Sequence, residues 1–461
     1  MPDAEQDALP HRLIRATRVP VRDFALWLVV LICSSSMYLY WSRIFEAEHN
    51  SSAAPSVLKP KALSDFYPSW YATRELLLHH RDPYGAEVNR ELQIAFYGKE
   101  LEPSRPEERR DQQRFVYPMY FVFFVAPTAW TPFQTVRTIL WWILAAFAAL
   151  NLALWLRFLR IRLSLPALAA LFAVVLSSIP VVQNLSILQP LLFAACFLAG
   201  AAVAVASGRL FLAGTLLAVA TIKPQACLLP LAWFGLWICS DWKRRRSLLW
   251  GFTAALSALV LASEWLLPGW LMRYPGVMRD YAEYTSTTSF LGLLLPPVVQ
   301  WLVTILELAA AAIFCWRARR QPADSPAFAL ALSFALTLTV SIVPAVIAPF
   351  NHVLLIPVVL LAIRYWRDFQ GRVVMRVAIS VFCLCAALSP LLAVLAVAKS
   401  LTPHTGWFQK MRPFPLATSM VIPFAAFGFL ILLCRVVTSQ STPFAPDSGR
   451  WKPTAAAEGE L

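Results

Sequence analysis

The sequence of 461 residues has little of what nucleotide-dependent enzymes are built on. It contains only 15 glycines, and neither a Walker phosphate-binding loop nor a Rossmann dinucleotide fingerprint occurs in it. Both motifs need closely spaced glycines, because the backbone must approach a phosphate or a pyrophosphate. The sequence therefore argues against a catalytic domain that uses a nucleotide.

Charged residues are also scarce, at 14% of the chain, whereas 59% of the residues are hydrophobic and the mean hydropathy is +0.60. This composition indicates a polytopic membrane protein. The net charge of +14 does not indicate a nucleic-acid partner, because the basic residues stand in clusters between apolar runs. Such clusters are typical of membrane orientation.

The eight cysteines predict neither a disulfide framework nor a metal site, and they leave the compartment open. All of them fall in or at the ends of apolar segments, where a thiol behaves as a small apolar group. They are Cys33, Cys196, Cys227, Cys239, Cys315, Cys383, Cys385 and Cys434.

The first apolar run, residues 24–45, follows an arginine-rich polar segment, residues 1–23. A signal peptide also has a basic flank, but this run is too long and lacks a small-residue cleavage site. We expect a retained membrane anchor whose basic flank keeps residues 1–23 in the cytoplasm. Residues 46–114 then form an outer loop, in which the charge-dense segment Arg105–Arg114 is a solvated hairpin tip.

The run Tyr117–Phe133 decides the topology of everything after it. It is apolar, but Pro118, Pro127 and Pro132 interrupt it. If it spanned the membrane, the later basic clusters would lie outside. If it is a surface or re-entrant segment, they lie inside, and the positive-inside rule favours this alternative. The first outer loop then extends over residues 46–137 and carries juxtamembrane, interfacial helices.

The expected fold is an all-α polytopic membrane protein, a bundle of about twelve transmembrane helices with both termini inside. Residues 24–435 form its transmembrane domain, and the Pro/Ser/Ala-rich residues 436–461 form a disordered cytoplasmic tail. The predicted spans are 24–45, 138–156, 166–182, 190–206, 210–222, 226–240, 247–267, 291–316, 327–347, 352–364, 374–398 and 416–435.

The stretch Ser64–Gly85 is the one place where an acid, several aromatic residues and paired histidines meet outside a long apolar run. Ser64 suits a helix N-cap, which would put Asp65 in the first helical turn. Aromatic residues at helical spacing then predict a short helix on the membrane surface. A purely structural alternative is an ordinary interfacial helix that Asp65 merely caps.

Under this topology the unusual polar residues gather at the outer ends of the spans, whereas the inner loops carry mainly arginine and lysine. These outer residues are Gln183, Asn184, Gln189, Lys223, Arg273, Arg279, Asp280, Asn351, His352, Lys399, His404, Lys410 and Arg412. The chemistry is therefore expected on the outer face.

Lys223, between two apolar runs, is either a snorkelling lysine or a contact for an anion such as a lipid phosphate. His352, at the outer end of a span, is either structural or a second phosphate contact. Glu264 and Glu307 lie within predicted spans, where carboxylates are functional candidates by default.

Several short motifs together resemble glycosyltransferase family 87, within the C-type (GT-C) membrane superfamily. The first outer loop begins with an acid and carries the pattern D-x-Y…D-P-Y, and a Tyr-Pro pair follows. An N…Q pair, a Lys-Pro pair and an Asn-His pair then stand at outer span ends. The matching residues are Asp65, Tyr67, Asp82, Pro83, Tyr84, Tyr117, Pro118, Asn184, Gln189, Lys223, Pro224, Asn351 and His352.

The chain departs from the family pattern at three places. His79-His80-Arg81 stands before the D-P-Y where the family often has glycine, Met119 replaces a second proline, and Leu188 precedes Gln189 where glycine is usual. These departures concern the identity of the acceptor more than the reaction class.

The resemblance implies a GT-C-like fold and the transfer of a hexose, often mannose, from a polyprenyl-phosphate donor to a glycan or glycolipid acceptor. It implies a bacterial plasma (inner) membrane protein with its active site on the outer, periplasmic side. Asp65 is the expected catalytic base, and no cofactor or metal is expected, because no second acid accompanies Asp65 in a D-x-D pattern. The expected substrate-binding residues are Tyr67, Tyr117, Asn184, Gln189, Lys223, Asn351 and His352.

Two other classes of protein stay open at this point. A polytopic transporter or lipid flippase suits about twelve spans, although we find no internal repeat and few glycines that could break helices. A non-enzymatic scaffold of the cell envelope would not need an acid, a lysine and a histidine on one face. A donor-hydrolysis or sugar-transfer assay separates these alternatives.

Overall fold

The computed structural model describes residues 21–39, 63–102, 112–284, 295–343, 349–365 and 421–437, with the short pieces 291–292, 373, 376–377 and 380–381. Within these residues the regular secondary structure is helical throughout. The predicted span 374–398 lies almost entirely outside the described residues. The same holds for most of the segments 1–23 and 436–461, predicted to be cytoplasmic, and for the loop before Leu63 and the predicted tip after Glu102. It also holds for Lys399, His404, Lys410 and Arg412.

The first half of the chain forms eleven helical elements in these residues. They are α1 (Val21–Leu39), α3 (Tyr67–His79), α4 (Ala86–Tyr97), η3 (Met119–Phe121), α5 (Val122–Val125), η4 (Ala126–Thr128), α6 (Phe133–Phe158), α7 (Leu165–Leu176), α8 (Ile179–Ile187), α9 (Leu191–Ala206) and α10 (Leu210–Ala220). The rest of the described chain forms α11 (Pro224–Ser240), α12 (Trp242–Leu266), α13 (Trp270–Tyr284), α15 (Pro297–Ala318), α16 (Pro326–Ile342), η5 (Pro349–Leu355), α17 (Ile356–Tyr365) and α21 (Ile422–Val437).

Three helices in the described residues, α6, α12 and α15, are long and apolar enough to cross a membrane. The pair α7–α8 makes a fourth if it counts as one broken span, because a bend of 53° separates its halves. Most of the other predicted spans correspond to apolar helices, but these are only 10–17 residues long. The predicted membrane character and all-α fold agree with the structure, whereas the count of about twelve spans is not confirmed.

The core of the bundle is made by α9, α11 and α16, and almost every side chain of α16 is buried. Its serines and threonines donate to backbone carbonyls one turn earlier, so these hydroxyls need no partner from another helix. By contrast, α12 and α15 expose large apolar side chains, such as Trp265 at 86% and Leu306 at 67% exposure. Apolar side chains on an outer helix are what contact with lipid requires.

Helices α10 and α12 cross in close contact because each presents a glycine at the crossing. A Cβ atom on Gly214 would lie 2.0 Å from the carbonyl oxygen of Leu248, and one on Gly251 would lie 2.0 Å from that of Phe211. Only glycine allows the two backbones to approach so closely, as is common where membrane helices pack on each other.

The basic clusters predicted for the inner face come together at one end of the bundle. Arg245, near the start of α12, donates to the carbonyl oxygens of Trp237 and Arg319. Arg160, after α6, pairs with Asp324 at 3.1 Å. Helix α11 has 17 residues, with Lys223 immediately before its first turn and Trp237 in its last. At 1.5 Å per residue it separates Lys223 from the basic end by about 25 Å.

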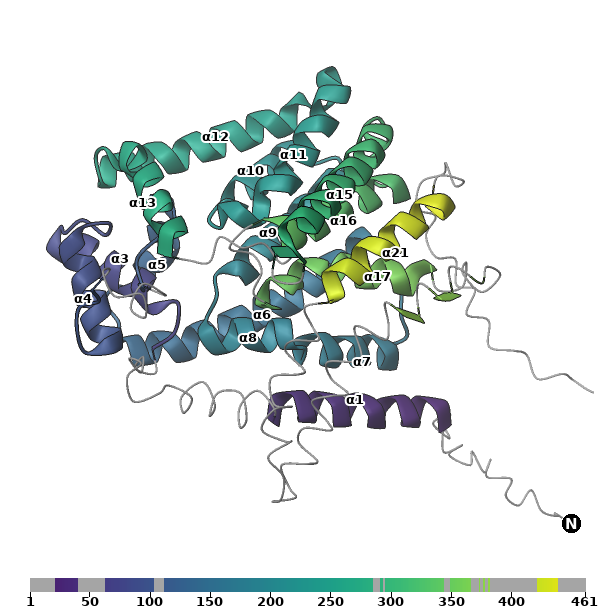
Figure 1. The fold of residues 1–461 in the computed structure, drawn as a ribbon, viewed down its shortest axis with the longest axis horizontal. Coiled ribbons are helices and arrows are strands. Elements are labelled where there is room, and N and C mark those ends of the chain that lie inside the picture. The colour runs from purple at the N-terminus through teal and green to yellow at the C-terminus, as the bar shows by residue number, and fades with distance from the viewer. Residues whose placement is uncertain are drawn as a thin grey trace, which may run out of the picture.

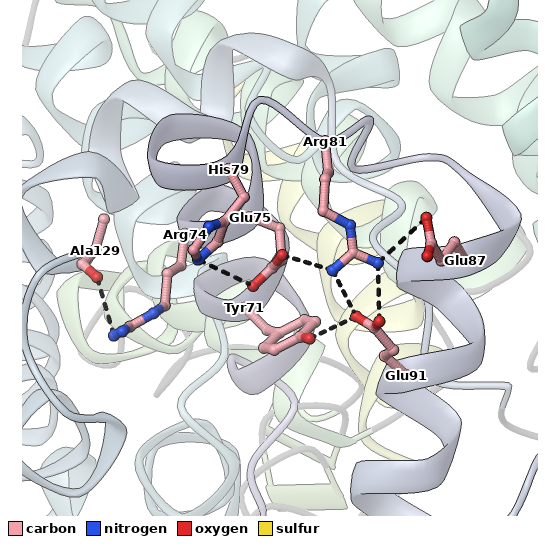
Figure 2. Close-up of polar contacts among 8 residues, drawn as sticks. All are labelled: Tyr71, Arg74, Glu75, His79, Arg81, Glu87, Glu91 and Ala129. Atoms are coloured by element: carbon pink, nitrogen blue, oxygen red, sulfur yellow. Dashed lines mark hydrogen bonds and ion pairs between the residues drawn. The ribbon is translucent and has the colours of Figure 1, made fainter.

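The predicted outer loop holds the helices α3 and α4, which gather with α5 at one end of the molecule (Figure 1). Figure 2 shows the ion-pair cluster that joins α3 to α4. The guanidinium of Arg81 contacts the carboxylates of Glu75 at 2.7 Å, Glu91 at 2.8 Å and Glu87 at 3.4 Å. The Tyr71 hydroxyl donates to Glu91 at 2.6 Å. Arg81 thus ties α3 to α4 through ion pairs.

The start of α3 differs from the prediction. The helix begins at Tyr67 and its N-cap is Phe66, without a side-chain cap. Ser64 therefore does not cap the helix: its backbone carbonyl accepts from the Tyr67 amide at 2.9 Å, and its buried hydroxyl has no hydrogen-bond partner in the structure. Asp65 lies in the preceding turn, because the turn closed by Ser64 delays the helix by two residues.

The run Tyr117–Phe133 is divided into η3, α5 and η4, which together cover Met119 to Thr128 before α6 begins. A spanning helix needs about 20 residues, and these three pieces are shorter. That this run stays out of the hydrocarbon core is still a prediction.

Candidate functional site

The centre of the site is a chain of three side chains from three separate parts of the sequence. The ammonium of Lys223 donates to Oε1 of Gln189 at 3.1 Å. The Nε2 group of Gln189 donates to Oδ2 of Asp65 at 2.5 Å. The structure thus brings together the predicted base, one predicted phosphate contact and one predicted substrate-binding amide.

Lys223 is held in place because the chain must end one helix and begin another here. Helix α10 closes at Ala220, and Pro224 opens α11 at the position where the missing amide hydrogen is tolerated. Lys223 is only 4% exposed, and its ammonium lies over the ring of Phe350, 4.9 Å from the centroid. It is therefore not a snorkelling lysine, since its charged end is buried.

Burial lowers the pKa of Lys223 to about 8, and the negative charge of Asp65 opposes the change. Starting from 10.5, this corresponds to about 3 kcal/mol against the charged form. A lysine that destabilises the fold to this extent is a candidate for function, because such groups persist where binding or catalysis needs them.

Gln189 reaches Asp65 through an unusual turn at the end of α8. Leu188 has φ 55° and ψ 52°, the left-handed region, and the Gln189 amide donates to the Asn184 carbonyl at 2.9 Å. Glycine, which the resemblance leads us to expect at this position, adopts this conformation without strain. Here the leucine keeps the turn and buries its side chain, which is 1% exposed.

Tyr117 lines the polar pocket, and its phenol is within reach of the charge of Asp65. Burial raises the pKa of Tyr117 well above its usual value, and the charges of Asp65, Tyr281 and Tyr274 add to the effect. The phenol therefore stays protonated and can donate a hydrogen bond at neutral pH.

A cavity beside this chain, which we call the polar pocket, is lined by Tyr117, Gln189, Lys223, Gln225, Tyr281 and Phe350, among others. Amide, phenol and ammonium groups next to aromatic rings suit a ligand rich in hydroxyl or phosphate oxygens. Gln225, Tyr281 and Phe350 were not predicted. The first two had no distinguishing signal, whereas Phe350 stands directly before the Asn-His pair.

Helix α13 covers one side of the polar pocket with Tyr281. It is tied to the predicted outer loop by an ion pair between Arg273 and Asp82. The Asp82 carboxylate also accepts from the Tyr84 amide at 2.9 Å, and the Tyr84 hydroxyl donates to the Tyr117 carbonyl at 2.7 Å. The D-P-Y turn therefore supports the pocket wall.

The segment η5 carries the predicted pair Asn351 and His352, and Asn184 fixes it in place. The Nδ2 group of Asn184 donates to the Phe350 carbonyl at 2.8 Å. Asn351 and His352 are 0% and 4% exposed, and none of their side-chain nitrogen and oxygen atoms has a hydrogen-bond partner in the structure. Buried polar groups are rarely left without partners, so these two suit a ligand.

His352 lines a second cavity of about 190 Å³, which we call the apolar groove. Its walls come from α1, α7, α8, η5, α17 and α21, and Figure 1 shows α1 alongside α7. Lys223 lines the polar pocket instead. The two predicted phosphate contacts therefore face different cavities, and both cavities border η5, one at Phe350 and the other at His352.

Tyr67 lies in an aromatic cluster rather than in either cavity. Its ring contacts Phe133 at 4.9 Å and Phe96 at 5.6 Å between centroids, and it stacks on Tyr71 at 5.9 Å. Aromatic pairs at these spacings stabilise a fold. Its observed contacts thus join α3 to α4 and α6.

Glu264 and Glu307, the acids predicted to lie within spans, line neither cavity. Glu264 accepts from the backbone amide of Gly269, which ties the end of α12 to the turn before α13. Glu307 is buried on α15, and its Oε2 has no partner in the structure. Among the described residues, no three His, Cys, Asp or Glu side chains are grouped as a metal site would need.

In comparisons with known proteins, residues 115–344, about half of the chain, match the family model described as Glycosyltransferase family 87. The matched region contains Tyr117, Asn184, Gln189 and Lys223, whereas Asp65 is joined to it by the hydrogen bond from Gln189. No curated protein and no solved structure matches the chain. The chain belongs to glycosyltransferase family 87 and is a membrane glycosyltransferase.

Proposed function

We propose that the protein transfers a hexose, mannose in the first instance, from a polyprenyl-phosphate donor to a hydroxyl of a glycan or glycolipid acceptor on the outer face of the membrane. The observation that carries the proposal is the chain of contacts from Lys223 through Gln189 to Asp65 beside the polar pocket. It joins a cation and a carboxylate, the two charges that this reaction needs.

In the proposed reaction Asp65 takes the proton from the acceptor hydroxyl. The acceptor oxygen forms a bond to the anomeric carbon of the sugar as the bond from that carbon to the phosphate oxygen breaks. The electron pair of the broken bond stays with the polyprenyl phosphate. Lys223 stabilises this departing anion, as preorganised cations do in phosphoryl and glycosyl chemistry.

The availability of the ammonium supports its role. An ammonium has three N–H donors, and Gln189 is the one hydrogen-bond acceptor that Lys223 has among the described residues. Lys223 lines the polar pocket, so donors are left for a phosphate oxygen. A charge-assisted hydrogen bond of this kind contributes about 1.5–3 kcal/mol.

The apolar groove supports a lipid-linked donor. It is almost entirely apolar, and the unpartnered imidazole of His352 is a polar group in its wall. An isoprenoid chain fits such a lining by the hydrophobic effect, and His352 can donate a hydrogen bond to the phosphate at its end. In this arrangement the tail lies on one side of η5 and the sugar on the other.

The test is a transfer assay with the purified full chain in lipid nanodiscs. The donor is polyprenyl phosphate that carries a labelled mannose, and octyl mannoside is the acceptor probe. A glycosyltransferase releases polyprenyl phosphate and labels the acceptor. A transporter or flippase would move the donor without cleaving it, and a scaffold would do neither.

Asp65→Asn is the decisive variant. Its side-chain carbonyl can still accept from Gln189, so the fold should survive. Loss of a general base lowers turnover by about 10²–10⁴, or about 3–5 kcal/mol of barrier, while donor affinity should hardly change.

The matched control is Asp82→Asn, which keeps an oxygen for the Tyr84 amide and loses only a partly exposed ion pair with Arg273. We expect near-wild-type turnover. If Asp82→Asn is inactive and Asp65→Asn is active, Asp65 is not the base.

A further inference from the structure

The amide of Gln189 is restricted to one orientation, because it lies between two groups of opposite charge. Lys223 can only donate, and an ionised Asp65 can only accept. The oxygen of the amide must therefore face Lys223 and its nitrogen must face Asp65, as observed. The reverse orientation would place the amide N–H donors against the ammonium of Lys223 and the amide oxygen against the carboxylate of Asp65. Gln189 is 6% exposed, so both hydrogen bonds are largely buried.

This orientation has a chemical consequence for Asp65. A cation at the amide oxygen withdraws electron density and strengthens the N–H donor at the other end, since hydrogen bonds in a chain polarise one another. The donor holds the carboxylate at Oδ2, 2.5 Å away, and fixes the plane of the acid. A direct ion pair between Lys223 and Asp65 would instead occupy the charges that the substrates need.

We propose that Gln189 is a positioning residue for the transfer reaction. It joins Lys223, the cation that stabilises the leaving group, to Asp65, the base, so that the two act as one unit. The inference rests on the proposed function, in which Asp65 is the base. It assigns Gln189 a role through Asp65, in addition to its place in the lining of the polar pocket.

The titratable groups around this unit come from several elements. Besides Asp65 and Lys223 they are Tyr117 before η3 and Tyr274 and Tyr281 on α13. Burial raises the pKa of both Tyr117 and Tyr274, which keeps these phenols neutral over the range of an assay near neutral pH. A shift of the acid limb that Gln189→Met shows and the control variant lacks is therefore assigned to Asp65.

The experiment measures turnover against pH for the full chain in nanodiscs, with mannose on polyprenyl phosphate as donor and octyl mannoside as acceptor. Gln189→Met removes both hydrogen bonds at similar volume. We expect turnover to fall by about 10- to 100-fold, with the donor KM changed less than about threefold. The acid limb should move to higher pH, because the carboxylate loses a donor that favours its charged form.

Gln189→Glu separates the two contacts. The introduced carboxylate can still accept from Lys223, but it faces Asp65 with a like charge. The acid limb should then move further than in Gln189→Met. In an Asp65→Asn background, Gln189→Met should cause little additional loss, because it acts through the missing carboxylate.

Gln183→Met is the matched control. Gln183 lies on α8, and its buried Oε1 has no hydrogen-bond partner in the structure, so we expect a wild-type profile. If wild-type protein does not cleave the donor, the proposed function fails. If Asp65→Asn behaves as expected but Gln189→Met keeps its turnover or its acid limb, only the role of Gln189 is overturned. Additive losses in the double variant would overturn it as well.

Discussion

Replacing Lys223 by methionine should keep or raise the stability of the fold and should lower the affinity for the donor. The change keeps most of the side-chain volume and removes the buried ammonium. Below pH 8 the charged lysine costs the fold about 3 kcal/mol, from the lowering of its pKa to about 8. The variant also leaves Oε1 of Gln189 without its donor, which costs about 1–3 kcal/mol. We therefore expect Lys223→Met to be as stable as the wild type, or up to about 2 kcal/mol more stable.

The pH dependence of stability tests separately whether the charged form of Lys223 destabilises the fold. Between pH 8 and 10.5 the unfolded chain holds a proton on Lys223 that the folded chain has released. Stability rises with pH wherever the unfolded state binds more protons. The wild type should gain stability across this window, and Lys223→Met should lack this gain. Thermal unfolding in nanodiscs at several pH values measures both.

Donor binding should change the other way. Loss of one charge-assisted contact to phosphate, worth about 1.5–3 kcal/mol, weakens donor affinity by about 10- to 150-fold. In the wild type, affinity should be constant below pH 8 and fall above it, because the ammonium loses its proton. In Lys223→Met the affinity should be low and should lack this fall.

Lys99→Met is the control, since Lys99 lies after α4 and does not line the polar pocket. It should leave donor affinity unchanged. A Lys223→Met protein that is less stable and binds donor normally would refute the reasoning, because the lysine would then be a structural group.

Three further predictions concern the fold. Gly251→Ala should destabilise by about 1–3 kcal/mol because its Cβ would meet the α10 backbone, whereas Gly235→Ala, with open space, should stabilise α11 by about 0.5–1 kcal/mol in thermal unfolding. Arg81→Met should cost about 1–3 kcal/mol, because Glu75 loses its 2.7 Å partner, and hydrogen exchange in α3 and α4 should rise. In a cysteine-free background, cysteine at Glu100 should react with an impermeant maleimide from outside, and cysteine at Lys243 only after permeabilisation; reaction at both from one side would contradict the topology.

Composition and local pattern were enough for the fold class and for most of the helices. Apolar runs predict helices because the backbone must satisfy its own hydrogen bonds in lipid, and α9, α10 and α11 lie where such runs lie. The ends of the helices were less predictable. Pattern alone placed a straight span over 166–182, whereas the chain breaks between α7 and α8. A break depends on how the neighbouring helices pack, which a hydropathy pattern does not record.

The sequence pointed to Lys223 because a charged group between apolar runs is costly and therefore informative. It pointed to Gln189 at the outer end of a span, and to Asp65 as the acid of the aromatic-rich stretch in the predicted outer loop. Their connection could not be found from the sequence. It depends on the left-handed turn at Leu188 and on a contact between residues 124 positions apart in the chain. The contacts that place Gln189 between Lys223 and Asp65, like the separate cavities of Lys223 and His352, were decided only by the tertiary structure, since distant side chains meet according to how the helices pack.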